Sequence, residues 1–136
     1  MRVVLDTNTL LVSIGRKSKY RIIFEALLEG RIRLLLTNEI LSEYVEILEA
    51  RTSPVVAKNI ANFLLRSPDV ERTEVYFRWA AIYADADDNK FVDCALNGNA
   101  DFIVTDDRHY RVLKTVPFPK IRVMRTREFA TMLGQR

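Results

Sequence analysis

Short apolar runs and amphipathic segments alternate along this chain. Runs rich in β-branched residues and leucine, each followed by a polar residue, predict four buried strands, at residues 2–6, 31–37, 100–105 and 120–124. Apolar residues at helical spacing predict helices at residues 19–30, 38–51, 54–66, 87–98 and 126–133. Weaker patterns predict a loop from Ser67-Pro68, an extended piece and then a helix in 73–83, and a helix or turn in 107–115.

The order of these elements predicts the fold class. Helices separate the strands, and the strands are short and apolar, which is typical of a parallel sheet with helices on both faces. We therefore expect an α/β fold of the Rossmann-like kind. It would be a three-layer α/β/α sandwich around a central parallel sheet of four to five strands.

Length and composition fit one compact domain. The chain has 136 residues, 49% of them hydrophobic, so a single domain over residues 1–136 is expected. No apolar run approaches the roughly 20 residues that span a bilayer. Asp6 and Asn8 interrupt the apolar start, where a signal peptide would need a continuous core. Cys94 is the single cysteine, which excludes an internal disulfide framework. A cytoplasmic location without membrane contact is the expectation.

Charge is distributed unevenly along the chain. Residues 1–68 carry a net charge of +3, residues 69–107 carry −7 and residues 108–136 carry +7. This asymmetry indicates a cation site in the middle of the chain and an anionic partner near its end. A solvated surface with uneven charge would give the same counts, so the residues themselves must decide.

Acidic side chains follow two of the predicted strands. Asp6 ends the first strand, and Asp106 and Asp107 end the strand at 100–105. The carboxyl ends of parallel strands meet at one edge of the sheet, where ligands bind in open α/β folds. These acids are therefore expected on the same edge, although about 100 residues separate them in the sequence.

Two predicted helices supply further acids. Asp88 falls within the apolar stripe of helix 87–98, and burying an unpaired carboxylate there would be costly. Glu43 lies at the edge of the apolar stripe of helix 38–51, close to the start of that helix. Asp93 points away from the stripe, so we expect it to be an ordinary surface acid.

These positions predict a metal centre made by Asp6, Glu43, Asp88 and Asp107. Carboxylates that converge repel one another unless a cation or protons compensate them. A site with oxygen ligands alone favours Mg²⁺ or Mn²⁺. Taken singly, each acid has a simpler interpretation: Asp6 and Asp88 could cap the helices that follow them, and Glu43 could be solvated.

Four segments of the chain stand out as motifs: "VVLDTN" at 3–8, "ILSEYVEIL" at 40–48, "DADDNKFVDCAL" at 85–96 and "ADFIVTDD" at 100–107. In this order they resemble the motifs of the PIN domain family, and within it a branch of bacterial toxin-like nucleases. The resemblance implies an α/β/α fold with a parallel sheet. It also implies a ribonuclease that depends on magnesium or manganese, as many PIN domains are. Many bacterial members are toxins of toxin–antitoxin pairs.

The resemblance also assigns residues. The family's four acidic positions match Asp6, Glu43, Asp88 and Asp107, which would hold the metal and carry the catalysis. Asn8 and Thr105 match the polar residues that support the first and fourth acids. Asp106 stands where relatives often have Gly or Asn, so either acid of the pair could be the ligand. Asp93 is an additional acid that we place outside the metal centre.

The expected reaction is hydrolysis of an RNA phosphodiester. Basic residues near the end of the chain are the candidates for binding the RNA backbone: Arg108, Arg111, Arg122, Arg125 and Arg127. An antitoxin protein is an expected partner, and the sequence leaves a homodimer open. His109 has no predicted role. The main alternative is a non-catalytic RNA-binding module that keeps the fold. A haloacid-dehalogenase-type enzyme would need a second aspartate where this chain has Asn8, and a receiver domain would need paired acids near the first strand.

Overall fold

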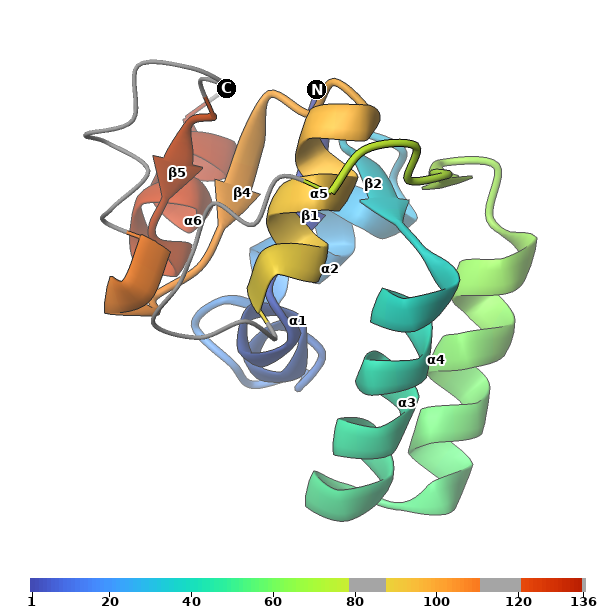
Figure 1. Ribbon diagram of the computed structural model, residues 1–136. Helices are drawn as coiled ribbons and strands as arrows, with labels where there is room; N and C mark the ends of the chain where they lie inside the picture. The colour runs from blue at the N-terminus through green and yellow to red at the C-terminus, as the bar shows by residue number, and fades with distance from the viewer. Residues whose placement is uncertain (79–87, 111–120, 136) are drawn as a thin grey trace.

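A parallel five-stranded sheet forms the centre of the molecule (Figure 1). The computed structural model describes residues 1–78, 88–110 and 121–135. The strands are β1 (Arg2–Leu5), β2 (Arg33–Leu36), β3 (Val70–Arg72), β4 (Phe102–Val104) and β5 (Val123–Met124). They lie in the order β3-β2-β1-β4-β5, and every neighbouring pair is parallel.

Helices cover both faces of this sheet. They are α1 (Thr7–Ser13), α2 (Arg21–Leu28), α3 (Asn38–Arg51), α4 (Pro54–Arg66), α5 (Asn89–Asn97) and α6 (Thr126–Gly134). In Figure 1, α5 lies in front of β1, and α2 and α6 lie behind the sheet. The long helices α3 and α4 pack against each other as a hairpin. The predicted three-layer α/β/α sandwich is confirmed.

The central strands are buried on both faces. The side chains of Val3, Val4 and Leu5 are fully buried, as are Leu34 and Leu35 on β2. This explains why the sequence of each of these central strands is an unbroken apolar run and does not alternate between apolar and polar residues. Burying each such side chain contributes about 1.5–3 kcal/mol relative to its exposure, so these runs fix the position of the sheet in the fold.

Local signals set the starts of the two long helices. The Thr37 hydroxyl accepts a hydrogen bond from the Ile40 backbone N–H at 3.1 Å and thereby caps α3. The Ser53 hydroxyl does the same for Val56 at 3.1 Å, and Pro54 follows at the first helical position of α4. Because α3 starts directly after β2, its first turns lie beside the carboxyl edge of the sheet.

The sheet has one strand that the apolar pattern did not predict. We expected a loop after Ser67-Pro68, but Val70–Arg72 forms β3 and pairs with β2, with Leu34 opposite Val70. β3 is a three-residue edge strand with two charged residues, so it lacks an apolar run and depends on its single neighbour. The described residues 73–78 form neither helix nor strand, and residues 79–83 lie outside the described part of the chain.

Asp93 was predicted wrongly as a surface acid, since only 3% of its surface is exposed. The prediction assumed that α5 buries one face. Instead, five consecutive residues of α5, from Phe91 to Ala95, are buried. The strands contact α5 on one side, and the segment before residue 79 covers another side, where Asn97 hydrogen-bonds the backbone N–H and C=O of Phe77.

The order of the strands creates one special position. From β1 the chain moves outward through β2 to β3, and it then returns to place β4 on the other side of β1. The gap beyond the carboxyl ends of β1 and β4 is therefore the topological switch point, where open α/β folds bind their ligands. Asp6 follows β1 and Thr105 follows β4, so both residues lie at this point.

Candidate active site

Asp6 is held across the switch point and not at the helix that follows it. It occupies the N-cap position of α1 but makes no side-chain capping hydrogen bond to that helix in the described structure. Its Oδ2 instead accepts a hydrogen bond from the Thr105 hydroxyl at 2.7 Å. The side chain is thus fixed between β1 and β4, and the usual N-cap bond to the second or third residue of α1 is not made in the described part of the chain.

Neighbouring charges act on Asp6. Burial is the largest cause that raises the pKa of its carboxyl above the usual range. The charges of Asp107 and Glu43 raise the pKa further, while hydrogen bonds from Thr105 and the Thr7 backbone N–H lower it. Asp107 and Glu43 therefore lie close enough to Asp6 for their charges to act on its carboxyl.

The two consecutive acids after β4 have different partners. Asp107 receives a hydrogen bond from the His109 backbone N–H at 2.9 Å, and its own N–H donates to the Thr105 hydroxyl at 3.1 Å. Thr105 thus connects Asp6 and Asp107. Asp106 is exposed, and its Oδ1 accepts from the Thr126 N–H, the first of α6, at 3.0 Å. Of these two acids, Asp107 is therefore the one that is connected to Asp6 through Thr105.

This difference predicts a stability effect for Asp106 that is separate from the site. Asp106→Ala removes the acceptor at the start of α6, and losing a helix cap costs about 0.5–2 kcal/mol. The free energy of unfolding in urea, measured in chelator, should fall by that amount. Asp106→Asn is the control, because an asparagine oxygen accepts the same bond. Equal stability of the alanine variant and the wild type would show that the bond to Thr126 contributes nothing.

Asp88 and His109 complete a group with Asp107. One ligand atom from each of the three side chains lies within 4.8 Å of the other two. His109 Nδ1 is 3.3 Å from Asp107 Oδ1 and 3.8 Å from Asp88 Oδ2. Only 9% of Asp88 is exposed, as its place in the apolar stripe predicted, and it makes no side-chain capping bond to α5 in the described structure. The cap interpretation of Asp88 is therefore unsupported.

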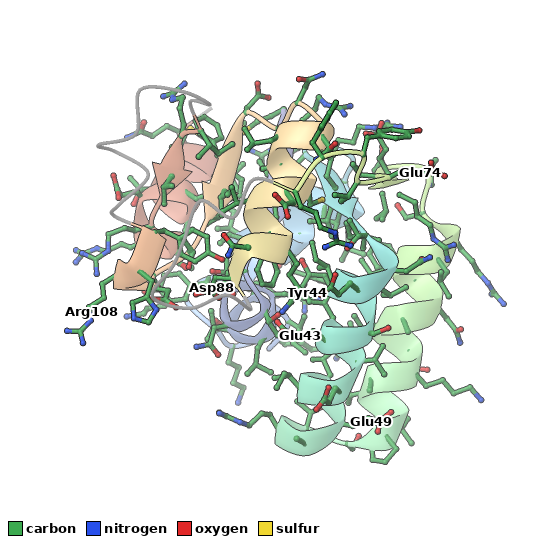
Figure 2. The ribbon with its side chains drawn as sticks, in the orientation of Figure 1. Glu43, Tyr44, Glu49, Glu74, Asp88 and Arg108 are labelled. Atoms are coloured by element: carbon green, nitrogen blue, oxygen red, sulfur yellow. The ribbon has the colours of Figure 1, made fainter. Side chains whose placement is uncertain are left out.

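Glu43 reaches α5 from the first turns of α3, where it contacts Lys90, two residues after Asp88. Its Oε1 lies 2.7 Å from Lys90 Nζ, and its Oε2 accepts a hydrogen bond from the Thr7 hydroxyl. Glu49, at the far end of the same helix, points away from this region in Figure 2. The next residue, Tyr44, is fully buried and donates to the Leu5 carbonyl at 2.5 Å, which joins α3 to the end of β1.

Sequence reasoning missed three of these side chains. His109 had no predicted role, and Lys90 and Thr7 were not considered. The signals were weak: Lys90 lies two residues after Asp88, and His109 two residues after Asp107, but nothing local shows that either side chain turns toward the acids. The tertiary packing determines that, including the contact of α5 with α3.

Two hollows flank the acids. One is lined by Asp6, Asn8, Val12, Tyr20, Asp106 and Asp107. The other is lined by Thr105, Asp106, Asp107, Arg108, Tyr110, Val123, Arg125 and Glu128. They share Asp106 and Asp107, so a continuous surface leads from the acids to two arginines. Asn8 and Thr105, the predicted supporting residues, each line one of these hollows.

The predicted RNA-binding arginines are spread over several positions. Arg108 and Arg125 line the second hollow, next to Asp107. Arg127 lines a different hollow together with Lys19 and Tyr20. Arg122 precedes β5, and its guanidinium lies 4.7 Å from the centre of the Phe102 ring. Arg111 lies outside the described residues.

A sequence model of the PIN domain matches residues 2–109 of the chain. The chain belongs to the PIN domain family. The match includes all four predicted acids, whereas most of the basic segment 108–136 lies beyond it. No curated protein matches the chain.

Two solved structures share this PIN fold. VapBC2 from Rickettsia felis, solved bound to a DNA fragment from its promoter, is 14% identical with a TM-score of 0.61, covering 92% of this chain and 98% of that one. VapBC-1 from nontypeable Haemophilus influenzae is 16% identical with a TM-score of 0.62, covering 93% of this chain and 99% of that one. At this identity the similarity shows the fold. Among the described residues, no helix is both long enough and apolar enough to cross a membrane.

Proposed function

We propose that this PIN domain is a divalent-metal-dependent endoribonuclease and the toxin of a toxin–antitoxin pair. One observation carries the proposal, which is the clustering of three acids at the switch point. The Thr105 hydroxyl hydrogen-bonds the Asp6 carboxylate and the Asp107 backbone N–H, and the His109 ring nitrogen Nδ1 lies between the carboxylates of Asp88 and Asp107. Acids from β1, α5 and the end of β4 thus meet where an α/β fold binds its ligand.

The donors present fit a hard divalent cation. Asp6, Asp88 and Asp107 offer carboxylate oxygens, which Mg²⁺ and Mn²⁺ prefer, with Glu43 beside them. Burial is the largest cause that raises the pKa of Asp6, and the charges of Asp107 and Glu43 raise it further, so a bound cation would stabilise the ionised carboxylate. His109 adds a nitrogen donor, which suits manganese better than magnesium. Bound here, the ion would lower the pKa of a water molecule and polarise the phosphate.

The protein's own residues would orient the reaction. The Thr105 hydroxyl holds the Asp6 carboxylate and the Asp107 backbone N–H, the His109 backbone N–H holds the Asp107 carboxylate, and Thr7 holds Glu43. Arg108 and Arg125, in the hollow beside Asp107, would bind the RNA phosphates that the acids repel. Tyr20, which lines the hollow on the other side, could stack on a base.

Support for the biological setting comes from the family and the fold. The chain resembles bacterial toxin-like nucleases and shares its fold with two VapBC proteins, one of them bound to promoter DNA. We infer a cytoplasmic, single-domain protein with an RNA substrate and an antitoxin partner, and a homodimer remains a further proposal. A non-catalytic RNA-binding module is the alternative, and it predicts RNA binding without cleavage in any metal.

The proposal is tested by the same substitution at two positions of α3. Wild-type protein should cleave a mixed RNA pool in Mg²⁺ or Mn²⁺ and be inactive in chelator. Glu43→Gln should lower the rate at least about tenfold, since it alters a group at the metal centre. Glu49→Gln, on the exposed far end of the helix, should cleave like wild type. Absence of metal-dependent cleavage by the wild-type protein would favour the binding module.

The basic hollow predicts a salt effect on RNA binding. A phosphate contact to single-stranded nucleic acid contributes about −0.7 to the slope of log K against log salt. Replacing both Arg108 and Arg125 with Gln should therefore flatten the slope by about 1.4, measured by fluorescence anisotropy in chelator. Arg51→Gln with Arg66→Gln, at exposed helix ends, is the matched control. An unchanged slope in the Arg108/Arg125 variant would show that these two arginines do not contact the RNA phosphates.

A further inference from the structure

Lys90 is a largely buried cation that contacts one of the predicted acids, Glu43. Its side chain is 9% exposed, and its Nζ lies 2.7 Å from Glu43 Oε1. Glu43 is itself 29% exposed, and its other oxygen accepts from the Thr7 hydroxyl. The Lys90 ammonium also lies 5.3 Å from the centre of the Phe91 ring. Both oxygens of Glu43 thus have a donor of the protein itself.

The position of Lys90 has an electrostatic consequence. Burying an ammonium group is costly unless a carboxylate compensates it, so Lys90 and Glu43 stabilise each other. Lys90 neutralises the charge of Glu43. Asp6, Asp88 and Asp107 are the other predicted ligands of a divalent ion, and the fixed positive charge beside Glu43 disfavours a second ion there. Two-metal nuclease centres need more negative charge, because the second ion adds two positive charges at close range.

We propose that Lys90 is a fixed cation that takes the place of a second divalent ion at this site. It holds Glu43 as a positioning residue, so that the centre binds a single ion through Asp6, Asp88 and Asp107. This inference rests on the proposed function, because it needs the carboxylates to bind a metal at all. It assigns to α5 both a metal ligand, Asp88, and the charge that limits how many ions are bound.

The proposal predicts that removing a positive charge improves metal binding. In Lys90→Met the side chain keeps its approximate length and loses its charge, so Glu43 becomes available to a cation. The variant should bind two Mn²⁺ ions, the first at least about tenfold more tightly than wild type does. Lys90→Arg keeps the charge and should bind one. Lys58→Met, an exposed lysine on α4, is the matched control and should also bind one.

Calorimetric titration of Mn²⁺ into chelator-stripped protein tests this, with a melting curve to show that each variant is folded. One ion in wild type and two in Lys90→Met support the proposal. Two ions in wild type, or one ion of unchanged affinity in Lys90→Met, overturn it and leave the nuclease assignment intact. If Lys90→Met does not fold, the double variant Glu43→Gln, Lys90→Met removes both charges and should bind one ion with wild-type affinity; two ions there would overturn the proposal. No ion in wild type would instead refute the metal centre itself.

Discussion

Asp6→Asn is expected to lower RNA cleavage by orders of magnitude while the protein stays folded. Asparagine has nearly the shape of aspartate, and its side-chain oxygen can still accept the hydrogen bond from Thr105. In the proposed function this negative charge would help to hold the hydrolytic ion, so its loss would also reduce the activation of water. Initial rates on a mixed RNA pool in Mn²⁺, measured for both proteins at equal concentration, give the effect directly.

The same variant should be at least as stable as wild type in chelator. Because burial and nearby charges raise the pKa of Asp6, the folded state holds this proton to a higher pH than the unfolded chain does. Ionised Asp6 therefore destabilises the wild type above that raised pKa, and the effect disappears below the ordinary pKa of an aspartate. The stability gain of Asp6→Asn should accordingly grow as the pH rises through this interval and then level off.

Asp106→Asn is the matched control for this experiment. It makes the same substitution after the neighbouring strand, at a residue that hydrogen-bonds the start of α6. Both the stability and the RNA cleavage of this variant should therefore remain close to wild type. If Asp6→Asn cleaves RNA as fast as the wild type, Asp6 does not belong to the catalytic site. If it is unfolded in chelator, the carboxylate is structural.

Tyr44→Phe is expected to destabilise the protein by about 1–3 kcal/mol, the cost of leaving a buried polar group without its partner. The Tyr44 hydroxyl is buried and donates to the Leu5 carbonyl, directly before Asp6. It joins the helix that carries Glu43 to the strand that carries Asp6. Urea denaturation in chelator measures the change in free energy.

Tyr76→Phe provides the comparison, because it removes the same hydroxyl at an exposed position. Tyr76 is 76% exposed, and its hydroxyl bonds to the exposed Glu74, so the substitution should change stability little. If both tyrosine variants lose the same free energy of unfolding, the bond from Tyr44 to Leu5 stabilises the protein no more than the exposed bond of Tyr76 does.

The parts of the fold that could be predicted are those determined by local sequence. Val3–Leu5, Leu34–Leu36 and Phe102–Val104 form the strands that their apolar runs predicted, since a parallel strand buried on both faces needs such a run. Thr37 and Ser53 mark helix starts through their own hydroxyls. The acids at strand ends were placed correctly on one edge because topology alone requires it.

The rest depends on contacts that the sequence does not display. β3 exists only through pairing with β2, and its residues carry no apolar run. Asp93 is buried because the segment before residue 79 and the neighbouring elements enclose α5, which a helical wheel cannot show. The sequence does not distinguish Asp106 from Asp107. The structure does, because Asp106 hydrogen-bonds the start of α6.

The acids of the candidate site could be proposed from the sequence, whereas the groups that contact them could not. Asp6, Glu43, Asp88 and Asp107 stand out because carboxylates at buried or strand-end positions need an explanation. Lys90 and His109 need none in the sequence, since a lysine on a helix and a histidine in a loop are ordinary. Their approach to Glu43 and Asp107 results from tertiary packing.

The most direct test of the proposed metal centre is the anomalous scattering of manganese in crystals of the protein soaked with Mn²⁺. A peak in the anomalous difference map within coordination distance of carboxylate oxygens from Asp6, Asp88 and Asp107 is the result that we predict. Crystals of Asp6→Asn treated in the same way should show a weaker peak or none. A map from the wild-type protein without a peak at these residues, or with its peak at another surface, would contradict the account.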